Sequence, residues 1–270
     1  MPFILKESTN GAKYYAIDEF DKTNMVKTCF TTKMGGVSNG EFSTLNMGTK
    51  TNDKRENIIK NYEIICEALG IRMENLVLSD QVHKDEIKIV HMEDKGKGIL
   101  CESDIKEIDG LITSQKDICL VTQYADCVPV YIFDKKNKVI SLVHSGWRGT
   151  VKKISKKAIE IMKDVYNTNP SDCIGAIGPS IGVCCYEVDE RVIEEFKKHF
   201  NNVEDFVKNK KNGKYNLDLW EANKSILKDT GLNEENIIVS HVCTMCNEEL
   251  FSYRRDNGNT GRMAAMMQLL

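Results

Sequence analysis

Two histidines and one cysteine stand at the ends of apolar segments in this sequence, and their side chains suit metal chemistry. His83 lies in DQVHKDEI, Cys127 in QYADCVPVYIFD and His144 in VISLVHSGWRGT. Polar residues that crowd the end of a strand are typical of side chains that a rigid sheet delivers into a cleft. One thiolate and two imidazoles leave the fourth position of a tetrahedral zinc ion open, as in catalytic zinc sites. The sequence therefore indicates an enzyme with zinc on His83, Cys127 and His144.

Each of these residues also has an ordinary structural interpretation, as a buried cysteine or a surface histidine. The three together favour a metal, because a thiolate needs a metal or a cation to form at neutral pH. Copper is an alternative to zinc, since two histidines and a cysteine are also blue-copper ligands. Five histidines and no His-x-His pair are nevertheless too few for several coppers. A metal-free hydrolase or deamidase is the other alternative, with Cys127 as nucleophile and His144 as base.

The residues next to these ligands suggest groups for anion binding and proton transfer. After His144, the glycines of HSGWRGT permit a tight turn, and Thr150 is expected to cap a helix. Backbone N–H groups at a helix start bind anions, and Arg148 adds a forked donor for phosphate or carboxylate. Asp126 precedes Cys127 directly and is the candidate for proton transfer.

Further cysteines and arginines have weaker signals. Cys243 and Cys246 form a CxxC without a second pair at zinc-finger spacing, so packing is the favoured interpretation. The adjacent Cys184 and Cys185 are likewise expected to pack in the interior. The segment FSYRRDNGNTGRM carries arginines among flexible residues, which suits either an anionic group or a solvated tail; these are Arg254, Arg255 and Arg262.

The elements that must position these side chains are short strands mixed with amphipathic helices. Apolar spacing predicts helices over 52–69, from 150 to about 165, from Asp189 and over 217–230. Strands are predicted at 86–91, 118–123, 128–133, 139–144, 174–177 and 237–242, and DKKNK joins the third and fourth of them as a hairpin. This order favours an α+β fold with mixed sheets over strict βαβ alternation.

Composition indicates a soluble globular protein and argues against nucleic-acid-binding and membrane proteins. The chain has 270 residues, is 41% hydrophobic and 29% charged, and carries a net charge of −3. The sequence has no concentrated block of basic residues of the kind that binds nucleic acid. It also has no apolar run long enough for a membrane span. With four prolines and no linker-like stretch, residues 1–270 are expected to form a single domain. Ten cysteines and an apolar N-terminal run too short for a signal peptide predict free thiols in the cytoplasm.

Several segments in this order resemble one family, the laccase-like polyphenol oxidoreductases, now described as purine nucleoside phosphorylases. They are TTKMGGVS, LNMG, DQVH, DGLIT, ADCVP, VHSGWRG, IGPSIGVCCYEV and CT…FSYRR…TGRM, from about residue 30 to 263. The resemblance implies an α/β sandwich with mixed sheets, related to the catalytic domain of cytotoxic necrotizing factor. It also implies zinc on His83, Cys127 and His144. Lys33, Lys84 and Ser145 depart from the family's usual residues.

The resemblance further implies an activity. Adenosine, inosine and S-methyl-5′-thioadenosine would be cleaved with phosphate, and adenosine would also be deaminated. Asp126 and Arg148 are then the expected catalytic residues, and Gln81, Asn46 and Arg255 the expected substrate-binding residues. A non-enzymatic partner protein is a further alternative, and the sequence leaves the oligomeric state open.

Overall fold

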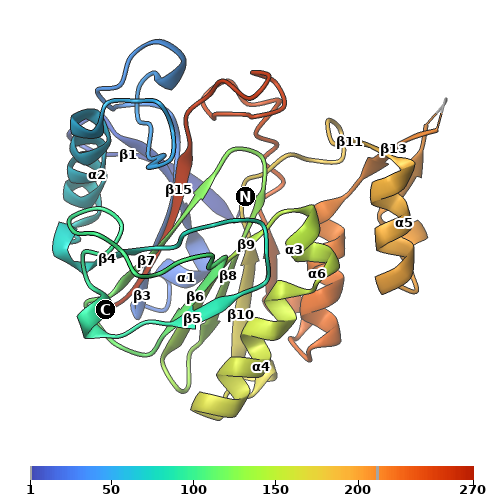
Figure 1. Ribbon diagram of the computed structural model, residues 1–270. Coiled ribbons are helices and arrows are strands. Elements are labelled where there is room, and N and C mark those ends of the chain that lie inside the picture. Colours follow the sequence, from blue (N-terminus) through green and yellow to red (C-terminus); the bar gives the residue numbers. More distant parts are fainter. Residues whose placement is uncertain (1, 211–212) are drawn as a thin grey trace.

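Two six-stranded β-sheets form the centre of the structure, a computed structural model that describes residues 2–210 and 213–270 (Figure 1). The first sheet has the spatial order β1-β2-β3-β15-β7-β4, and only the β4–β7 pair is parallel. Its strands are β1 (Phe3–Glu7), β2 (Lys13–Ile17), β3 (Val26–Thr31), β15 (Met263–Leu269), β7 (Cys119–Tyr124) and β4 (Leu76–Leu78).

The second sheet has the order β14-β10-β8-β9-β6-β5. Its outermost pairs, β10–β14 and β5–β6, are parallel, and the central pairs are antiparallel. Its strands are β14 (Ile237–Val239), β10 (Cys173–Ile177), β8 (Val128–Asp134), β9 (Val139–Ser145), β6 (Gly110–Thr113) and β5 (Ile87–Ile89).

The two sheets pack face to face, and helices cover their outer faces, so the architecture is a four-layer sandwich (Figure 1). Helix α2 (Arg55–Leu69) packs through Tyr62 and Ile65 on the outer face of the first sheet. Helices α3 (Trp147–Val151), α4 (Ile154–Tyr166) and α6 (Leu219–Asp229) cover the second sheet. Strand β15 illustrates the layering: Met267 points into the core between the sheets, and its neighbour Met266 points toward α2.

A small third sheet extends from the sandwich and carries its own helix (Figure 1). It contains β11 (Glu187–Asp189), β13 (Lys214–Leu217) and β12 (Val207–Asn209), and α5 (Glu190–His199) packs beside it through a cluster of phenylalanines. The remaining elements are single turns: α1 (Asp18–Asp21), η1 (Gly40–Phe42), η2 (Met73–Asn75), η3 (Met92–Asp94), η4 (Pro170–Asp172), η5 (Val203–Asp205) and η6 (Glu234–Asn236).

The structure confirms the α+β fold with mixed sheets and the hairpin of β8 and β9, and it corrects the helix expected from Thr150. That segment contains two helices, α3 and α4, separated at Lys153, whose φ is 55°. Thr150 lies inside α3 and donates its hydroxyl to the Gly146 carbonyl, so it caps no helix. Val165, expected on the inner face, is 52% exposed.

Within residues 2–210 and 213–270, no helix combines the length and the apolar character needed to cross a lipid bilayer.

Candidate metal centre and cavity

The register of the β8–β9 hairpin brings Cys127 and His144 to the same end of the second sheet. Pro129 pairs with His144 and Val128 with Ser145, so Cys127, just before β8, lies opposite the turn that follows β9. Gly146 occupies that turn. A Cβ atom on Gly146 would lie 3.0 Å from the Cys127 sulfur and 3.5 Å from the His83 ring. Glycine therefore leaves room for the sulfur and the imidazole to approach each other.

His83 arrives from the loop between β4 and β5, and the buried carboxylate of Asp109 fixes this loop. Asp109 accepts the backbone N–H groups of Val82, His83 and Lys84 at 2.9–3.1 Å. It also lies 2.8 Å from Nδ1 of His144. Burial alone would raise the pKa of Asp109, but these hydrogen bonds hold it below its usual range. One carboxylate thus positions both histidines.

The three side chains converge on a common point. Their potential ligand atoms all lie within 4.8 Å of one another, and the Cys127 sulfur is 3.9 Å from Nε2 of His83. Desolvation would raise the pKa of the Cys127 thiol, but the imidazoles of His144 and His83 lower it to about 6. Burial would lower the pKa of His144, whereas Cys127 and Asp109 raise it. The group therefore favours a thiolate, the form that binds metals.

This donor set fits a single metal ion with an open position. Asp109 occupies Nδ1 of His144, which leaves Nε2 as the donor, and such carboxylate–histidine pairs orient ligands in metal sites. Two imidazoles and one thiolate are ligands for zinc or copper. The expected juxtaposition of the three residues is present, and their role as zinc ligands stays a prediction.

The three side chains line a cavity of about 470 Å³, within the usual range for small-molecule sites. Its wall combines cations, aromatic rings and amides. The side chains in question are Lys50, Ser79, Gln81, Gln123, Asp126, Tyr186, Tyr253, Arg254 and Arg262. A polar, partly cationic ligand with an aromatic portion would find partners here.

Two of the expected site residues, Gln81 and Asp126, line this cavity. The Gln81 amide bonds with both the backbone N–H and the carbonyl of Gln123, at 2.7 and 2.8 Å. Asp126 accepts the Thr244 hydroxyl at 2.6 Å and the backbone N–H of Arg254 at 2.7 Å. Both side chains therefore hold the cavity wall together as well as facing the cavity.

Three other expected site residues lie outside the cavity lining. Arg148 is exposed, and its guanidinium lies 4.3 Å from the centre of the Trp147 ring. Asn46 is fully buried; its amide bonds with Thr51 and Asp53 and accepts two backbone N–H groups. The Arg255 guanidinium pairs with Asp256 and with several backbone carbonyls. The polar atoms of Asn46 and Arg255 thus already have partners within the protein.

Several groups at this site were not predicted from the sequence. Asp109 lies just before β6, and the pairing of Gly110 with Val143 places it beside His144. A carboxylate just before a strand that neighbours the histidine strand was the available signal. Lys50, Tyr186 and Tyr253 come from three separate loops and carried no signal of their own.

These features define an α+β sandwich protein. At the ends of two central strands of one sheet, a cysteine–histidine group with an open ligand position faces a cavity. A family model described as "Multi-copper polyphenol oxidoreductase laccase" matches residues 27–270. The chain therefore belongs to this family, as its motifs indicate.

Comparisons with individual proteins agree with this membership. The chain is 38% identical, over 240 residues, to "Purine nucleoside phosphorylase YlmD" of Bacillus subtilis (strain 168), covering 88% of this chain and 86% of that protein. It is 30% identical to "Adenosine deaminase RL5" of an unknown prokaryotic organism, covering 90% of this chain and 96% of that protein. The crystal structure of hypothetical protein YfiH from Bacillus licheniformis superposes with a TM-score of 0.93 at 34% identity, covering 100% and 99% of the two chains.

Proposed function

We propose that this chain is a zinc-dependent purine nucleoside enzyme. It would cleave adenosine, inosine and S-methyl-5′-thioadenosine with phosphate, and it would also deaminate adenosine. The observation that carries the proposal is one cavity that joins His83, Cys127 and His144 to two arginines and two tyrosines. The names of the relatives, a purine nucleoside phosphorylase and an adenosine deaminase, support the same substrate class.

The cavity offers separate binding partners for phosphate and for the purine base. Arg254 and Arg262 are suited to phosphate, because guanidinium groups donate two parallel hydrogen bonds to its oxygens. We assign this task to them in place of Arg148, which lies outside the lining. The rings of Tyr186 and Tyr253 offer flat surfaces on which a purine base can stack.

In phosphorolysis, a phosphate oxygen forms a bond to C1′ of the ribose, and the bond between C1′ and the purine nitrogen breaks. The electron pair of that bond leaves with the base, which must then be protonated. The arginines hold the attacking phosphate, and fixed positive charge stabilises the negative charge that develops. A zinc ion on the three ligands would supply Lewis acidity at this point.

In deamination, water adds to C6 of adenine and the amino group leaves as ammonia. A proton must pass from the water to the departing nitrogen. Asp126 lies directly before Cys127 and lines the cavity, and it is our candidate for this transfer. The Thr244 hydroxyl and the backbone N–H of Arg254 donate to this carboxylate and hold it in place at the cavity wall.

A second candidate function rests on the line formed by Cys127, His144 and Asp109. A thiol, an imidazole and a carboxylate on the imidazole's Nδ1 make up the nucleophile, base and orienting group of a cysteine hydrolase. The expected relation to the catalytic domain of cytotoxic necrotizing factor would agree with this metal-free alternative. Copper on the same ligands, with oxidation of phenols, is the alternative that the family's name suggests.

Two expectations from the sequence stay part of the proposal. We propose that residues 1–270 act as one domain, because the cavity is lined from both Lys50 and Arg262. The proposed location is the cytoplasm, which rests on the sequence alone.

The test is incubation of the purified protein with adenosine, with and without phosphate, followed by liquid chromatography. Adenine that appears only with phosphate supports phosphorolysis, and inosine that appears without it supports deamination. Cys127→Ala should remove both products. Cys101→Ser is the matched control, because Cys101 is an exposed thiol outside the cavity.

Each alternative has its own outcome in this design. No product from zinc-loaded protein would overturn the nucleoside proposal. Full activity after removal of all metal would favour the Cys127–His144 hydrolase. Phenol oxidation that requires added copper would favour the oxidase.

A further inference from the structure

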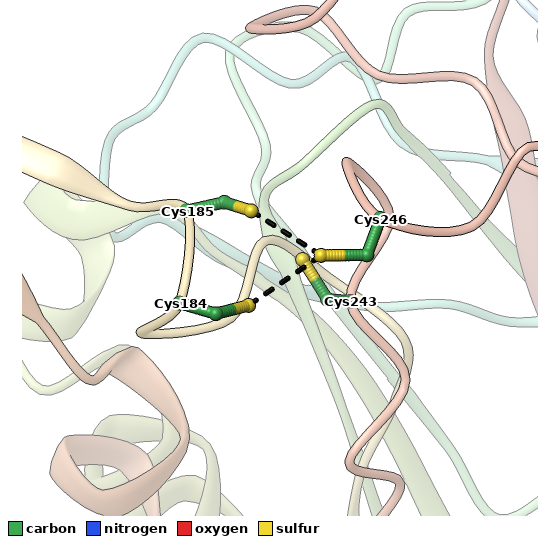
Figure 2. A group of neighbouring side chains, drawn as sticks. All are labelled: Cys184, Cys185, Cys243 and Cys246. Carbon is green, nitrogen blue, oxygen red and sulfur yellow. Dashed lines mark hydrogen bonds between the residues drawn. The ribbon is translucent and has the colours of Figure 1, made fainter.

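Four cysteines that the proposed function does not use meet on the surface of the structure. Cys184 and Cys185 come from the turn between β10 and β11, and Cys243 and Cys246 from the turn after β14. Figure 2 shows all four sulfur atoms pointing toward one another from these two turns. They were expected to pack in the interior, yet Cys184 and Cys246 are exposed and only Cys243 is buried. Packing therefore does not account for the group.

We propose that these four cysteines bind one zinc ion in a closed tetrathiolate site. All four sulfurs lie within 4.8 Å of one another. The Cys246 sulfur is 3.6 Å from that of Cys184 and 3.3 Å from that of Cys185. A tetrahedral zinc ion with bonds of about 2.3 Å places its sulfurs about 3.8 Å apart. The observed sulfur–sulfur distances thus fit four thiolates around a single ion. An iron–sulfur cluster would need its thiolates farther apart, because they bind different iron atoms.

The backbone around the four cysteines fits their use as ligands. Cys184 and Cys185 lie in the turn at 183–185, and Cys243 and Cys246 lie just before and within the turn at 244–246, with all four thiols toward the centre. The backbone N–H of Gly182 donates to the Cys243 sulfur at 3.2 Å. Such bonds spread part of the negative charge that four thiolates on a divalent ion would carry.

A positive side chain also supports the turn that carries Cys243 and Cys246. The Arg255 guanidinium donates to the carbonyls of Thr244 and Asn247 at 3.3 and 3.2 Å. This explains the placement of Arg255 outside the cavity. Its charge would offset part of the net negative charge of a zinc tetrathiolate.

The ion would join two segments that form one wall of the active-site cavity. The turn with Cys184 and Cys185 leads directly to Tyr186, and Ile181 precedes it; both line the cavity. The other turn contains Thr244, whose hydroxyl holds Asp126. A closed tetrathiolate has no position for substrate, so its effect would be to fix this wall. This assignment does not depend on which reaction the cavity performs.

The experiment is a metal count on the full chain, loaded with zinc under reducing conditions and then freed of unbound metal. The proposal expects a second zinc ion per chain beyond the one assigned to the cavity. Cys127→Ala should lose only the cavity's ion, and Cys184→Ser/Cys246→Ser should lose only the other. Cys101→Ser should keep both. A wild-type count that the double variant leaves unchanged would overturn the proposal.

Cobalt(II) substitution keeps the test valid if the double variant fails to fold. Cys127→Ala loaded with cobalt should retain strong thiolate-to-metal charge-transfer absorption and the visible bands of a tetrahedral ion, since four sulfurs remain. Absence of these bands from folded Cys127→Ala would count against the site. Mass spectrometry without reductant provides the last readout: loss of two hydrogens per pair would reveal disulfides and overturn the proposal.

Discussion

Within residues 2–210 and 213–270, two sulfur-bearing groups have side chains suited to bind a metal, and they differ in the elements that hold them. Cys127 and His144 stand at the end of the β8–β9 hairpin, and His83 is tied to the same sheet through Asp109. The four cysteines lie on two turns outside both sandwich sheets. The first group has three donors and faces a cavity; the second has four donors and leaves no ligand position free.

This difference suits the first group to catalysis and the second to stabilisation of the fold. A zinc ion with three protein ligands keeps a position for chemistry, whereas one with four thiolates contributes folding energy. A rigid sheet suits the first task, because chemistry requires fixed geometry. Loops suit the second, because a metal can order segments that have few apolar contacts of their own. The comparison predicts that activity depends chiefly on the first group and stability on the second.

The largest expected effect comes from removing a ligand of each group in turn. Cys127→Ala should lower turnover of adenosine by more than about 100-fold, because loss of outer-shell partners alone costs about 10–100-fold. Cys184→Ser/Cys246→Ser should instead lower the free energy of unfolding. With zinc at about 100 times its Kd, the lost contribution is about 2.7 kcal/mol. Activity assays and denaturant unfolding measure the two effects, and equal loss of activity in both variants would break the comparison.

The next effect concerns the carboxylate that links the histidines. Asp109→Asn should weaken metal binding in the cavity by about 10–100-fold, since the amide cannot accept from His144 and from every backbone donor of the 82–84 turn. Asp94→Asn is the matched control. Asp94 is also a buried carboxylate, which accepts the His91 N–H at 2.9 Å and a lysine at 2.8 Å, but it lies outside the cavity lining.

Competition with a chromogenic chelator measures the affinity of the cavity's ion in each variant. The control should bind the metal as the wild type does, even if it unfolds more readily. Unchanged affinity in Asp109→Asn would show that sheet register alone orients His144.

The geometry of the first group could be anticipated because it follows from a local hairpin. The two strands are apolar runs on either side of the short turn DKKNK, and their pairing carries Cys127 and His144 to one end. Helix α5 could equally be predicted from the sequence, since Asp189 caps it by accepting the Val192 N–H. In both cases the residues that determine the structure lie close together in the sequence.

The remaining features depend on contacts between distant segments. Strand β15, MAAMMQL, is buried on both faces and therefore lacks the alternation that marks a half-buried strand. The four cysteines come together only because Thr244 and Val242 bond with the backbone of Ser180. The three arginines near the C-terminus look alike in sequence, and loop folding alone directs Arg254 and Arg262 into the cavity and Arg255 away from it.

Arg254 contacts segments next to both groups, and its substitution is expected to have a smaller effect that tests whether the two groups have separate roles. Its backbone N–H holds Asp126, and its guanidinium donates to the Glu187 carbonyl, just after the paired cysteines. Arg254→Met keeps the backbone contact and removes the charge. It should raise the KM for phosphate by about 10–100-fold, the equivalent of about 1.5–3 kcal/mol for a charged hydrogen bond.

Arg148→Met is the control for this prediction, because Arg148 stacks on Trp147 outside the cavity lining. Steady-state kinetics at varied phosphate should show little change in this variant. A larger rise in the KM for phosphate in Arg148→Met than in Arg254→Met would instead locate the phosphate site at the turn after β9.

The last pair of variants compares the two glycines that adjoin the groups. A Cβ on Gly182 would come within 2.7 Å of the Trp220 ring, so Gly182→Ala should destabilise the fold by about 1–3 kcal/mol. A Cβ on Gly146 would crowd the Cys127 sulfur at 3.0 Å, so Gly146→Ala should reduce turnover more than stability. Unfolding curves and activity assays on both variants test this. If Gly182→Ala lost activity at full stability, the wall that the four cysteines hold would belong to the reacting site, and the division between the groups would fail.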